Sequence, residues 1–291
     1  MNQNKTDRGR HIAWIFLPTI FAMIIQTAVA ILIMEFMMVW EFGTTTKSDY
    51  ADFITDVMVK YASPESIASI SLVYALITGI IMFVLYRNNY RDGQIAGLKF
   101  RVSNWGIMTV GTVLFIISMQ YVTVYLMNAL SAAFPSWLEE YKAMTEAAGL
   151  ESDISPLMIV YAVLLGPICE ELLFRGVTFF AARKVMPIQF AILVQAILFG
   201  AFHMNKLQGV YAFVLGLGLG YAMYLYDNLI VVILIHMGYN LIGVLELPAG
   251  GDNLFTFFLC SLASLVVAYL SIILMRNASS VVNNEEFFAD N

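Results

Sequence analysis

Long apolar runs recur along the chain, and short polar stretches separate them. A membrane-spanning helix needs about 20 consecutive, mostly apolar residues. Runs of this kind predict a series of transmembrane helices near residues 12–39, 66–86, 104–130, 156–182, 188–206, 209–226, 228–247 and 255–275. The pattern therefore predicts an all-α fold, a polytopic membrane helix bundle of about eight transmembrane helices.

The composition agrees with this class. Of the 291 residues, 60% are hydrophobic and only 12% are charged, whereas soluble domains carry about 25% charged residues. A disordered protein, a nucleic-acid-binding protein and an ordinary cytosolic globular protein are all excluded by these values. We expect the lipid bilayer as surroundings and no nucleic acid as partner.

Basic residues between the apolar runs predict the orientation, because cytoplasmic loops carry the excess of Lys and Arg. One side holds Lys5, Arg8, Arg10, Arg87, Arg91, Lys99, Arg101, Arg183, Lys184 and Arg276. The other side holds only Lys47, Lys60, Lys142 and Lys206. Both termini are therefore predicted to be cytoplasmic, and an even number of spans also requires them to share a side.

Two acidic connections, residues 40–65 and 131–155, are predicted to be outward loops. In the second connection Trp137, Leu138, Tyr141 and Met144 are spaced as one apolar face of a helix. This spacing fits a helix lying at the membrane interface, and an ordered surface loop fits it equally well.

Ionisable side chains stand out inside three of the apolar runs. At the centre of a bilayer such a residue costs at least about 2.5–3.5 kcal/mol on insertion scales, so it is retained for a reason. The fourth run contains Glu170, Glu171 and Arg175, the fifth contains His203, and the seventh contains His236 and Asn240.

Helical spacing sorts these residues, because positions four apart share a face. Glu171 can therefore pair with Arg175 within one helix. Glu170 is rotated by about 100° from Glu171, so it is the carboxylate without a partner on its own helix. A carboxylate that faces two histidines in a closed cleft is a candidate general base.

Pro167 lies just before the acidic pair and removes one backbone donor. It is expected to bend the fourth helix near Glu170. At 1.5 Å per residue, Glu170 lies about 20 Å from Arg183, and His236 about 12 Å from Asn228. The glutamate and the histidines can therefore meet only if the helices are staggered, bent or begin at different depths.

Two other interpretations of these residues compete with catalysis. Buried Glu and His residues are common in transporters, so a proton- or cation-coupled transporter is the first alternative. Transporters usually show broken helices in both halves of the chain, and here only the fourth run has a break beside charges. A polar network that holds helices together in a non-catalytic scaffold is the second alternative.

Three spaced motifs resemble a known family. They are Glu170-Glu171-x-x-x-Arg175, Phe199-x-x-x-His203 and His236-x-x-x-Asn240. In order and spacing they resemble the CAAX protease and bacteriocin-processing family of intramembrane proteases, which includes the type II CAAX prenyl endopeptidases. The resemblance implies an eight-helix fold and an endopeptidase that hydrolyses peptide bonds inside the membrane.

The resemblance also implies a role for each motif residue. Glu170 would activate water and His203 would help to hold it, while His236 and Asn240 would stabilise the oxyanion. Glu171 and Arg175 would orient the site, and Phe199 would pack beside His203. The family was first described as metalloendopeptidases, so zinc bound by Glu170, His203 and His236 stays open beside a mechanism without metal.

Substrates implied by the resemblance are membrane-anchored proteins or peptides, either prenylated CAAX proteins or bacteriocin-like peptides, that enter from the cytoplasmic side. The chain is expected to divide into an N-terminal region of three spans with acidic outward loops (1–155), a catalytic core (156–247) and a last span with a cytoplasmic tail (248–291). The short loops suit the plasma membrane of a bacterium.

Overall fold

The computed structural model describes residues 2–44, 49–89, 102–150, 154–245, 248–251 and 253–279. Across these ranges the fold is all-α, and its one β-type contact is an isolated bridge between Val102 and Ser279. Each predicted apolar run lies in a helix, which confirms the predicted membrane bundle.

Within the described ranges, six helices are long and apolar enough to cross a membrane, and two further apolar helices are shorter. The long ones are α1 (Asn2–Thr44), α3 (Pro64–Asn89), α4 (Trp105–Ala133), the segmented helix from Pro156 to Arg183, α10 (Lys206–Tyr226) and α12 (Leu254–Ala278). The shorter ones are α9 (Ile188–Phe202) and α11 (Leu229–Val244). Whether these two also cross the bilayer stays a prediction.

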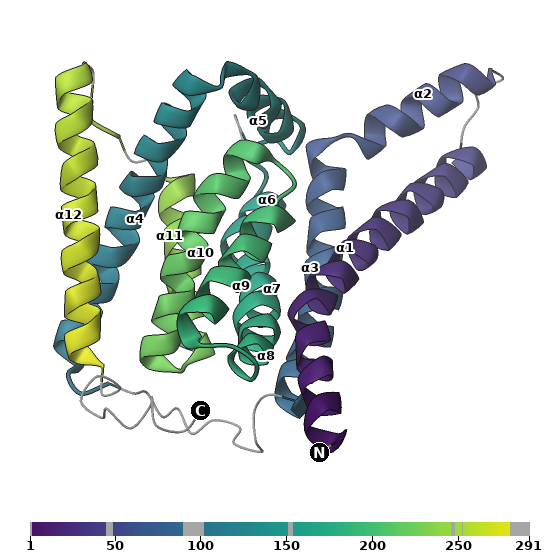
Figure 1. Cartoon of the computed structure of the whole chain (residues 1–291). Coiled ribbons are helices and arrows are strands. Elements are labelled where there is room, and N and C mark those ends of the chain that lie inside the picture. The colour runs from purple at the N-terminus through teal and green to yellow at the C-terminus, as the bar shows by residue number, and fades with distance from the viewer. Residues whose placement is uncertain are drawn as a thin grey trace.

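The helices are arranged around a central group (Figure 1). The segmented helix, α9, α10 and α11 lie in the middle, with α4 and α12 packed together on one side and α1 and α3 on the other. Large side chains fill the middle of the bundle without reaching its surface, among them Leu173, Phe174, Phe199, Leu219 and Tyr226.

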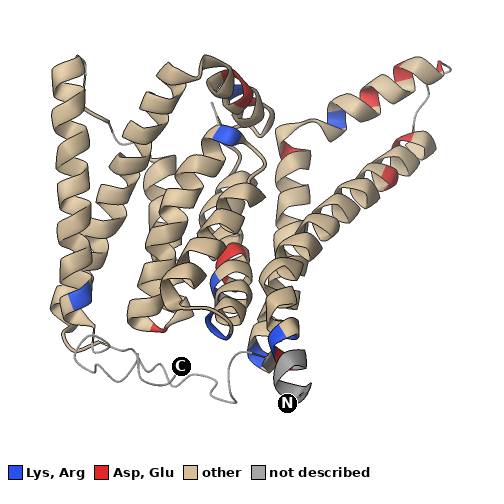
Figure 2. Cartoon of the chain, in the orientation of Figure 1, with Lys and Arg blue, Asp and Glu red and all other residues tan. Residues whose placement is uncertain are grey.

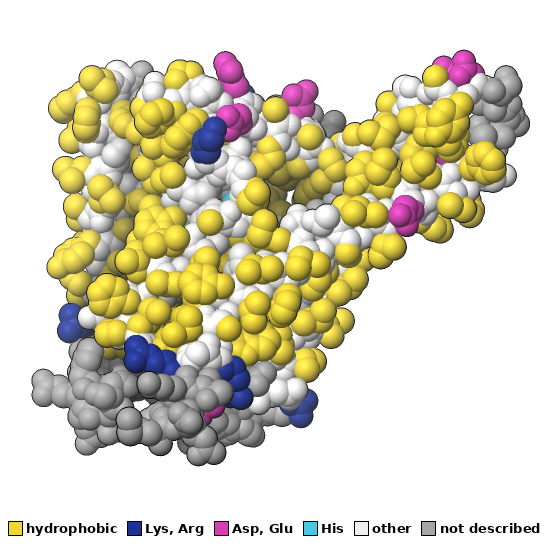
Figure 3. All heavy atoms as spheres, turned by 45° about the vertical axis from the view of Figure 1, so that its right-hand side comes forward, with side chains coloured by type: hydrophobic (Ala, Val, Ile, Leu, Met, Phe, Trp, Pro, Cys, Tyr) yellow, Lys and Arg dark blue, Asp and Glu magenta, His cyan; other side chains and the backbone are white. Residues whose placement is uncertain are grey.

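The upper half of α1 leaves the bundle and forms an arm with α2 (Tyr50–Tyr61) (Figure 1). Phe36 and Trp40 on this arm are 66% and 61% exposed. Hydrophobic side chains cover most of the arm and of the body beside it (Figure 3). A surface this apolar is suited to contact with lipid.

The first of the two acidic connections, residues 40–65, is largely helical where the structure describes it, so its prediction as a loop is wrong. Residues 50–61 form α2, which Asp49 caps by accepting a hydrogen bond from the backbone N–H of Ala51. Phe53 and Val57 are four positions apart and share a face, and both are buried. An amphipathic helix places its acids on the polar face, so an acid-rich composition did not distinguish it from a loop.

The second connection contains α5 (Pro135–Ala147), which decides between the two interpretations of residues 131–155 in favour of the helix. Trp137 stacks on Phe134 with ring centroids 4.5 Å apart. Tyr141 meets Tyr211 of α10 edge to face at 6.5 Å. The apolar face of α5 therefore packs over the central helices.

The segmented helix is irregular on both sides of the acidic pair. It runs through α6 (Pro156–Ile159), a π-helix η1 (Val160–Leu165), α7 (Gly166–Glu171), a second π-helix η2 (Leu172–Thr178) and α8 (Phe179–Arg183). π-helical turns within α-helices are rare and often occur at functional sites. Pro167 itself lies in α7, between the two π-helices, and the expected bend near Glu170 stays a prediction.

Charged residues separate between the two ends of the bundle (Figure 2). The lower end in that view, called here the basic end, holds Arg8, Arg10, Arg87, Arg183, Lys184 and Arg276. The opposite end carries α2 with Asp52 and Asp56, and α5 with Glu139, Glu140 and Glu146. Lys47, Arg91, Lys99, Arg101, the side chain of Lys5 and the tail 280–291 lie outside the described residues. The side of the membrane on which each end lies stays a prediction.

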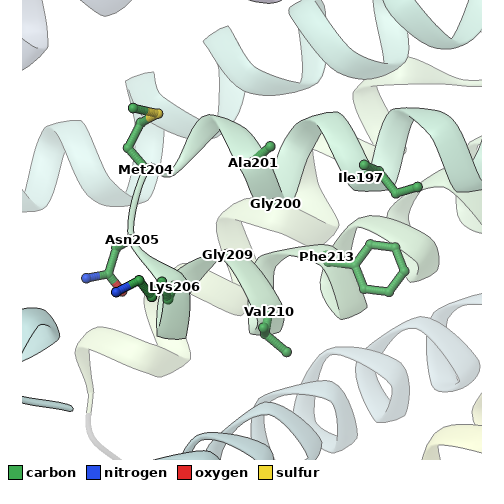
Figure 4. A pocket seen from close by; sticks show the side chains of 9 residues that line it. All are labelled: Ile197, Gly200, Ala201, Met204, Asn205, Lys206, Gly209, Val210 and Phe213. Carbon is green, nitrogen blue, oxygen red and sulfur yellow. The ribbon is translucent and has the colours of Figure 1, made fainter. Parts of the chain in front are cut away.

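α9 and α10 cross very closely at two glycines. A Cβ atom added at Gly200 would lie 2.5 Å from the carbonyl oxygen of Gly209. The outer side of this crossing carries a hollow of about 530 Å³ with mainly apolar walls, which include Ile197, Met204 and Phe213 (Figure 4). The close crossing brings the end of α9, where His203 lies, against the start of α10.

Candidate active site

A cavity of about 940 Å³ lies among the central helices and brings the three motifs together. Five of the seven motif residues line it: Glu170, Phe199, His203, His236 and Asn240. The other two, Glu171 and Arg175, have no exposed surface. They stand outside the cavity lining, in contact with residues that form it.

Glu170 and His236 face each other within this cavity. The Nε2 atom of His236 lies 3.7 Å from the Oε2 atom of Glu170. The side chain of Glu170 is 17% exposed, whereas that of His236 is 3% exposed. Glu170 is therefore the carboxylate of the acidic pair that water in the cavity can reach.

Glu171 joins two helices through one oxygen atom. Its Oε1 accepts a hydrogen bond from Arg175 Nη1 at 2.7 Å and lies 2.7 Å from His236 Nδ1. The sequence predicted the pair with Arg175, which is confirmed, but not the contact with His236. A carboxylate paired with arginine is only an acceptor, so His236 donates from Nδ1 and turns Nε2 toward Glu170.

Arg175 is held on three sides. Its guanidinium lies 4.6 Å from the centre of the Phe199 ring, and its Nη2 donates to the carbonyl of Gly216 at 3.2 Å. Gln195 donates to that same carbonyl at 2.8 Å and is completely buried. The sequence analysis did not single out Gln195. The signal that could have identified it is an amide in an apolar run, four positions before Phe199.

His203 is the C-cap of α9, one residue beyond the helix. Its Nδ1 donates to the carbonyl of Phe199 at 2.8 Å, since a carbonyl can only accept. The Phe199 ring meets His203 edge to face at 5.0 Å and His236 at 5.7 Å. Phe199 thus separates and orients the two imidazoles.

Asn240 is fixed by a contact to the segmented helix. Its Nδ2 donates to the carbonyl of Ala162 in η1 at 2.7 Å. An amide nitrogen has two hydrogens, so this bond holds the side chain in place and leaves a second donor. The irregular turn of η1 therefore contacts the end of α11 beside the cavity.

The comparison with known proteins follows this geometry. Residues 152–242 match the family described as type II CAAX prenyl endopeptidase Rce1-like. This segment is therefore similar to the Rce1-like family. All seven motif residues lie within it. No curated protein and no solved structure matches the chain.

The Rce1-like match implies a membrane-embedded protease, and it does not favour a transporter. Glu171 Oε2, Arg175 Nε and Gln195 Oε1 are buried without a hydrogen bond to the described residues.

Further polar groups of the cavity come from residues other than the seven motif residues. Thr123 of α4 and Tyr239 of α11 share a hydrogen bond of 2.7 Å between their hydroxyl groups. Gln120, Tyr141, Tyr161 and Tyr211 also line the cavity. These residues make the cavity partly polar and extend it well beyond Glu170.

A zinc site is not formed by these side chains as they stand. Among the described residues, no group of three or more His, Cys, Asp or Glu side chains is arranged to hold a metal ion. His203 and His236 each use Nδ1 within the protein, to Phe199 and Glu171. The zinc hypothesis therefore rests on the family resemblance and stays a prediction.

Proposed function

We propose that the protein is an intramembrane endopeptidase that hydrolyses peptide bonds of membrane-anchored proteins or peptides with glutamate-activated water. The observation that carries this proposal is the cavity in which Glu170 faces His236, with Glu171 and Arg175 buried beside it. Amide hydrolysis needs an activated water and donors aimed at the developing oxyanion, in a site that restricts solvent.

In the proposed reaction Glu170 removes a proton from a water molecule that His203 orients. The water oxygen bonds to the carbonyl carbon of the substrate, and the carbonyl oxygen becomes an oxyanion. Glu170 then gives its proton to the leaving nitrogen as the carbon–nitrogen bond breaks. Each proton transfer of this kind typically contributes about 10²–10⁴-fold to the rate.

The proposed oxyanion donors are His236 and Asn240. Because Nδ1 of His236 donates to Glu171, Nε2 can also donate only if the ring carries both protons. Glu170 and Glu171 are the two carboxylates beside the ring. Asn240 would add its second amide hydrogen.

The first test is cleavage of a membrane-delivered peptide library by the purified protein. We expect cleavage that Glu170→Gln abolishes and Glu146→Gln preserves, because Glu146 is exposed on α5. Cleavage that survives a chelator supports the glutamate mechanism, and cleavage that a chelator abolishes and zinc restores supports a metalloendopeptidase. If Glu170→Gln cleaves the library at the same rate as the unsubstituted protein, Glu170 is not the base.

The substrates that we propose are membrane-associated, and the cleaved sequences will show whether they resemble prenylated CAAX termini or bacteriocin-like peptides. The plasma membrane of a bacterium is the proposed location. A proton- or cation-coupled transporter would need access to Glu170 from both ends of the bundle, and proton flux in liposomes tests that alternative.

A further inference from the structure

The active-site cavity occupies only one half of the bundle. On the segmented helix its lining stops at Glu170 and includes Met158, Tyr161, Ala162, Gly166 and Pro167. No described residue between Leu172 and Arg183 lines it. Glu170 lies near the middle of this 28-residue helix, so the cavity reaches the site from the N-terminal end of the helix.

The neighbouring helices repeat this pattern. α10 contributes residues from its first half, and α11 contributes residues from its second half. Because α10 and α11 run in opposite directions (Figure 1), these two halves lie at the same end of the bundle. The lining residues are Gln208, Tyr211, Ala212 and Leu215 of α10, and His236, Tyr239, Asn240, Gly243 and Val244 of α11.

The other half of the bundle, between Glu170 and the basic end, is tightly packed. Leu173, Phe174 and Val177 of η2 have no exposed surface. Phe179 of α8 and Tyr226 of α10 are likewise fully buried. A substrate chain approaching from the basic end would have to displace this core.

The cavity instead extends to α5 and to the residues that follow it. Leu138, Tyr141, Lys142 and Met144 of α5 belong to its lining. Lys142 is exposed, so the lining continues from Glu170 to the surface at this end. This end carries the acidic helices α2 and α5 and lies opposite the basic end (Figure 2).

Cytoplasmic ends of membrane helices carry the excess of Lys and Arg. Applied to the charge separation in this bundle, the rule places the basic end in the cytoplasm and α5 outside. We propose that the active-site cavity opens on the extracytoplasmic face, and that the substrates are extracytoplasmic segments of membrane-bound or exported peptides. This inference rests on the proposed peptidase function and opposes the cytoplasmic access that the family resemblance implies.

Cysteine labelling tests the sidedness without any substrate. Lys142→Cys marks the mouth of the cavity, and Lys184→Cys is a matched exposed lysine at the basic end. Both variants are made in a Cys260→Ser protein, which keeps the buried Cys169. The Cys260→Ser protein without a further substitution is the control for background labelling. They are treated with a membrane-impermeant maleimide in spheroplasts of a bacterial host, before and after permeabilisation.

We expect Lys142→Cys to be labelled in intact spheroplasts and Lys184→Cys only after permeabilisation. Labelling of Lys184→Cys in intact spheroplasts overturns the proposed orientation. Labelling of Lys142→Cys only after permeabilisation, or only after unfolding in detergent, overturns an extracytoplasmic mouth.

Sided cleavage tests access to the site itself. The peptide library is added outside right-side-out and inverted membrane vesicles, and to detergent-solubilised protein. In detergent we expect cleavage that is lost in Glu170→Gln. In vesicles we expect the rate of this cleavage to be several-fold higher in right-side-out than in inverted vesicles. More cleavage in inverted vesicles refutes extracytoplasmic access and leaves the peptidase standing. Absence of Glu170-dependent cleavage in detergent refutes the peptidase, while the labelling still decides the orientation of the mouth.

Discussion

The Nε2 atom of His236 lies 3.7 Å from the Oε2 atom of Glu170, although 66 positions of sequence separate the two residues. The opposite nitrogen of the same ring is bound to Glu171 at 2.7 Å. Adjacent glutamates on one helix therefore contact opposite sides of one imidazole. The buried glutamate fixes the ring, and the accessible glutamate is the one that the proposed reaction uses as base.

Replacement of Glu170 tests this division of labour. We expect Glu170→Gln to lower the rate of cleavage by about 10²–10⁴-fold, the usual contribution of a general base. Its melting temperature should stay near that of the parent, because Glu170 is partly exposed and its contact with His236 is longer than a hydrogen bond. Assays of cleavage and of thermal unfolding in detergent check both statements; a folded Glu170→Gln variant with full activity would contradict the role.

Replacement of Glu171 should both lower the stability of the protein and disturb the orientation of the His236 ring. Glu171→Gln leaves the charge of Arg175 buried without its counter-ion, and removal of one partner of a buried pair costs about 3–5 kcal/mol. The new amide also turns a donor toward either Arg175 or His236. We therefore expect a lower free energy of unfolding and a loss of cleavage in this variant.

A double variant separates the two effects of Glu171→Gln. Adding Arg175→Met removes the unpaired charge, so stability should recover in part, as buried ion pairs often tolerate replacement by apolar groups. Cleavage should stay low, because His236 still lacks the carboxylate that holds its ring. Recovery of cleavage along with stability would show that Glu171 matters only for folding.

The sequence predicted what depends on local pattern. Apolar runs predicted the helices, and the four-residue spacing predicted the pair Glu171–Arg175, which is found. The family resemblance implied that Phe199 packs beside His203, and this contact is also found. The amphipathic helix α2 was missed because its acids resemble those of a solvated loop.

The spacing of residues within one helix could not predict contacts between helices that are far apart in the sequence. The bond from His236 to Glu171 joins α11 to α7, and the shared Gly216 carbonyl joins Gln195 to Arg175. Register between two helices is decided by packing, such as the approach of Gly200 to Gly209, and no period in one sequence encodes it. The position of the cavity in one half of the bundle could not be predicted from the sequence either, because it depends on which halves of several helices lie apart.

Gln195 is expected to be a positioning residue. Gln195→Leu removes a donor from the Gly216 carbonyl that also binds Arg175, and loss of a buried hydrogen bond costs about 1–3 kcal/mol. The rate of cleavage should fall with little change in KM, because Gln195 acts through Arg175 and is absent from the cavity lining. Gln189→Leu, an exposed position on the same helix, is the matched control; equal behaviour of the two variants would refute the role.

The glycine crossing of α9 and α10 should be as sensitive as the polar network. In Gly200→Ala the added Cβ would lie 2.5 Å from the Gly209 carbonyl oxygen, which is backbone and cannot turn away. The two helices must separate, and overpacking of this kind costs about 1–3 kcal/mol. Because Phe199 and His203 lie on either side of Gly200 along α9, cleavage should fall as well. Gly43→Ala is the control, since its Cβ would meet nothing within 4 Å. Thermal unfolding and cleavage measured side by side check the prediction, and a Gly200→Ala variant that matches Gly43→Ala in both would show that the crossing tolerates a methyl group.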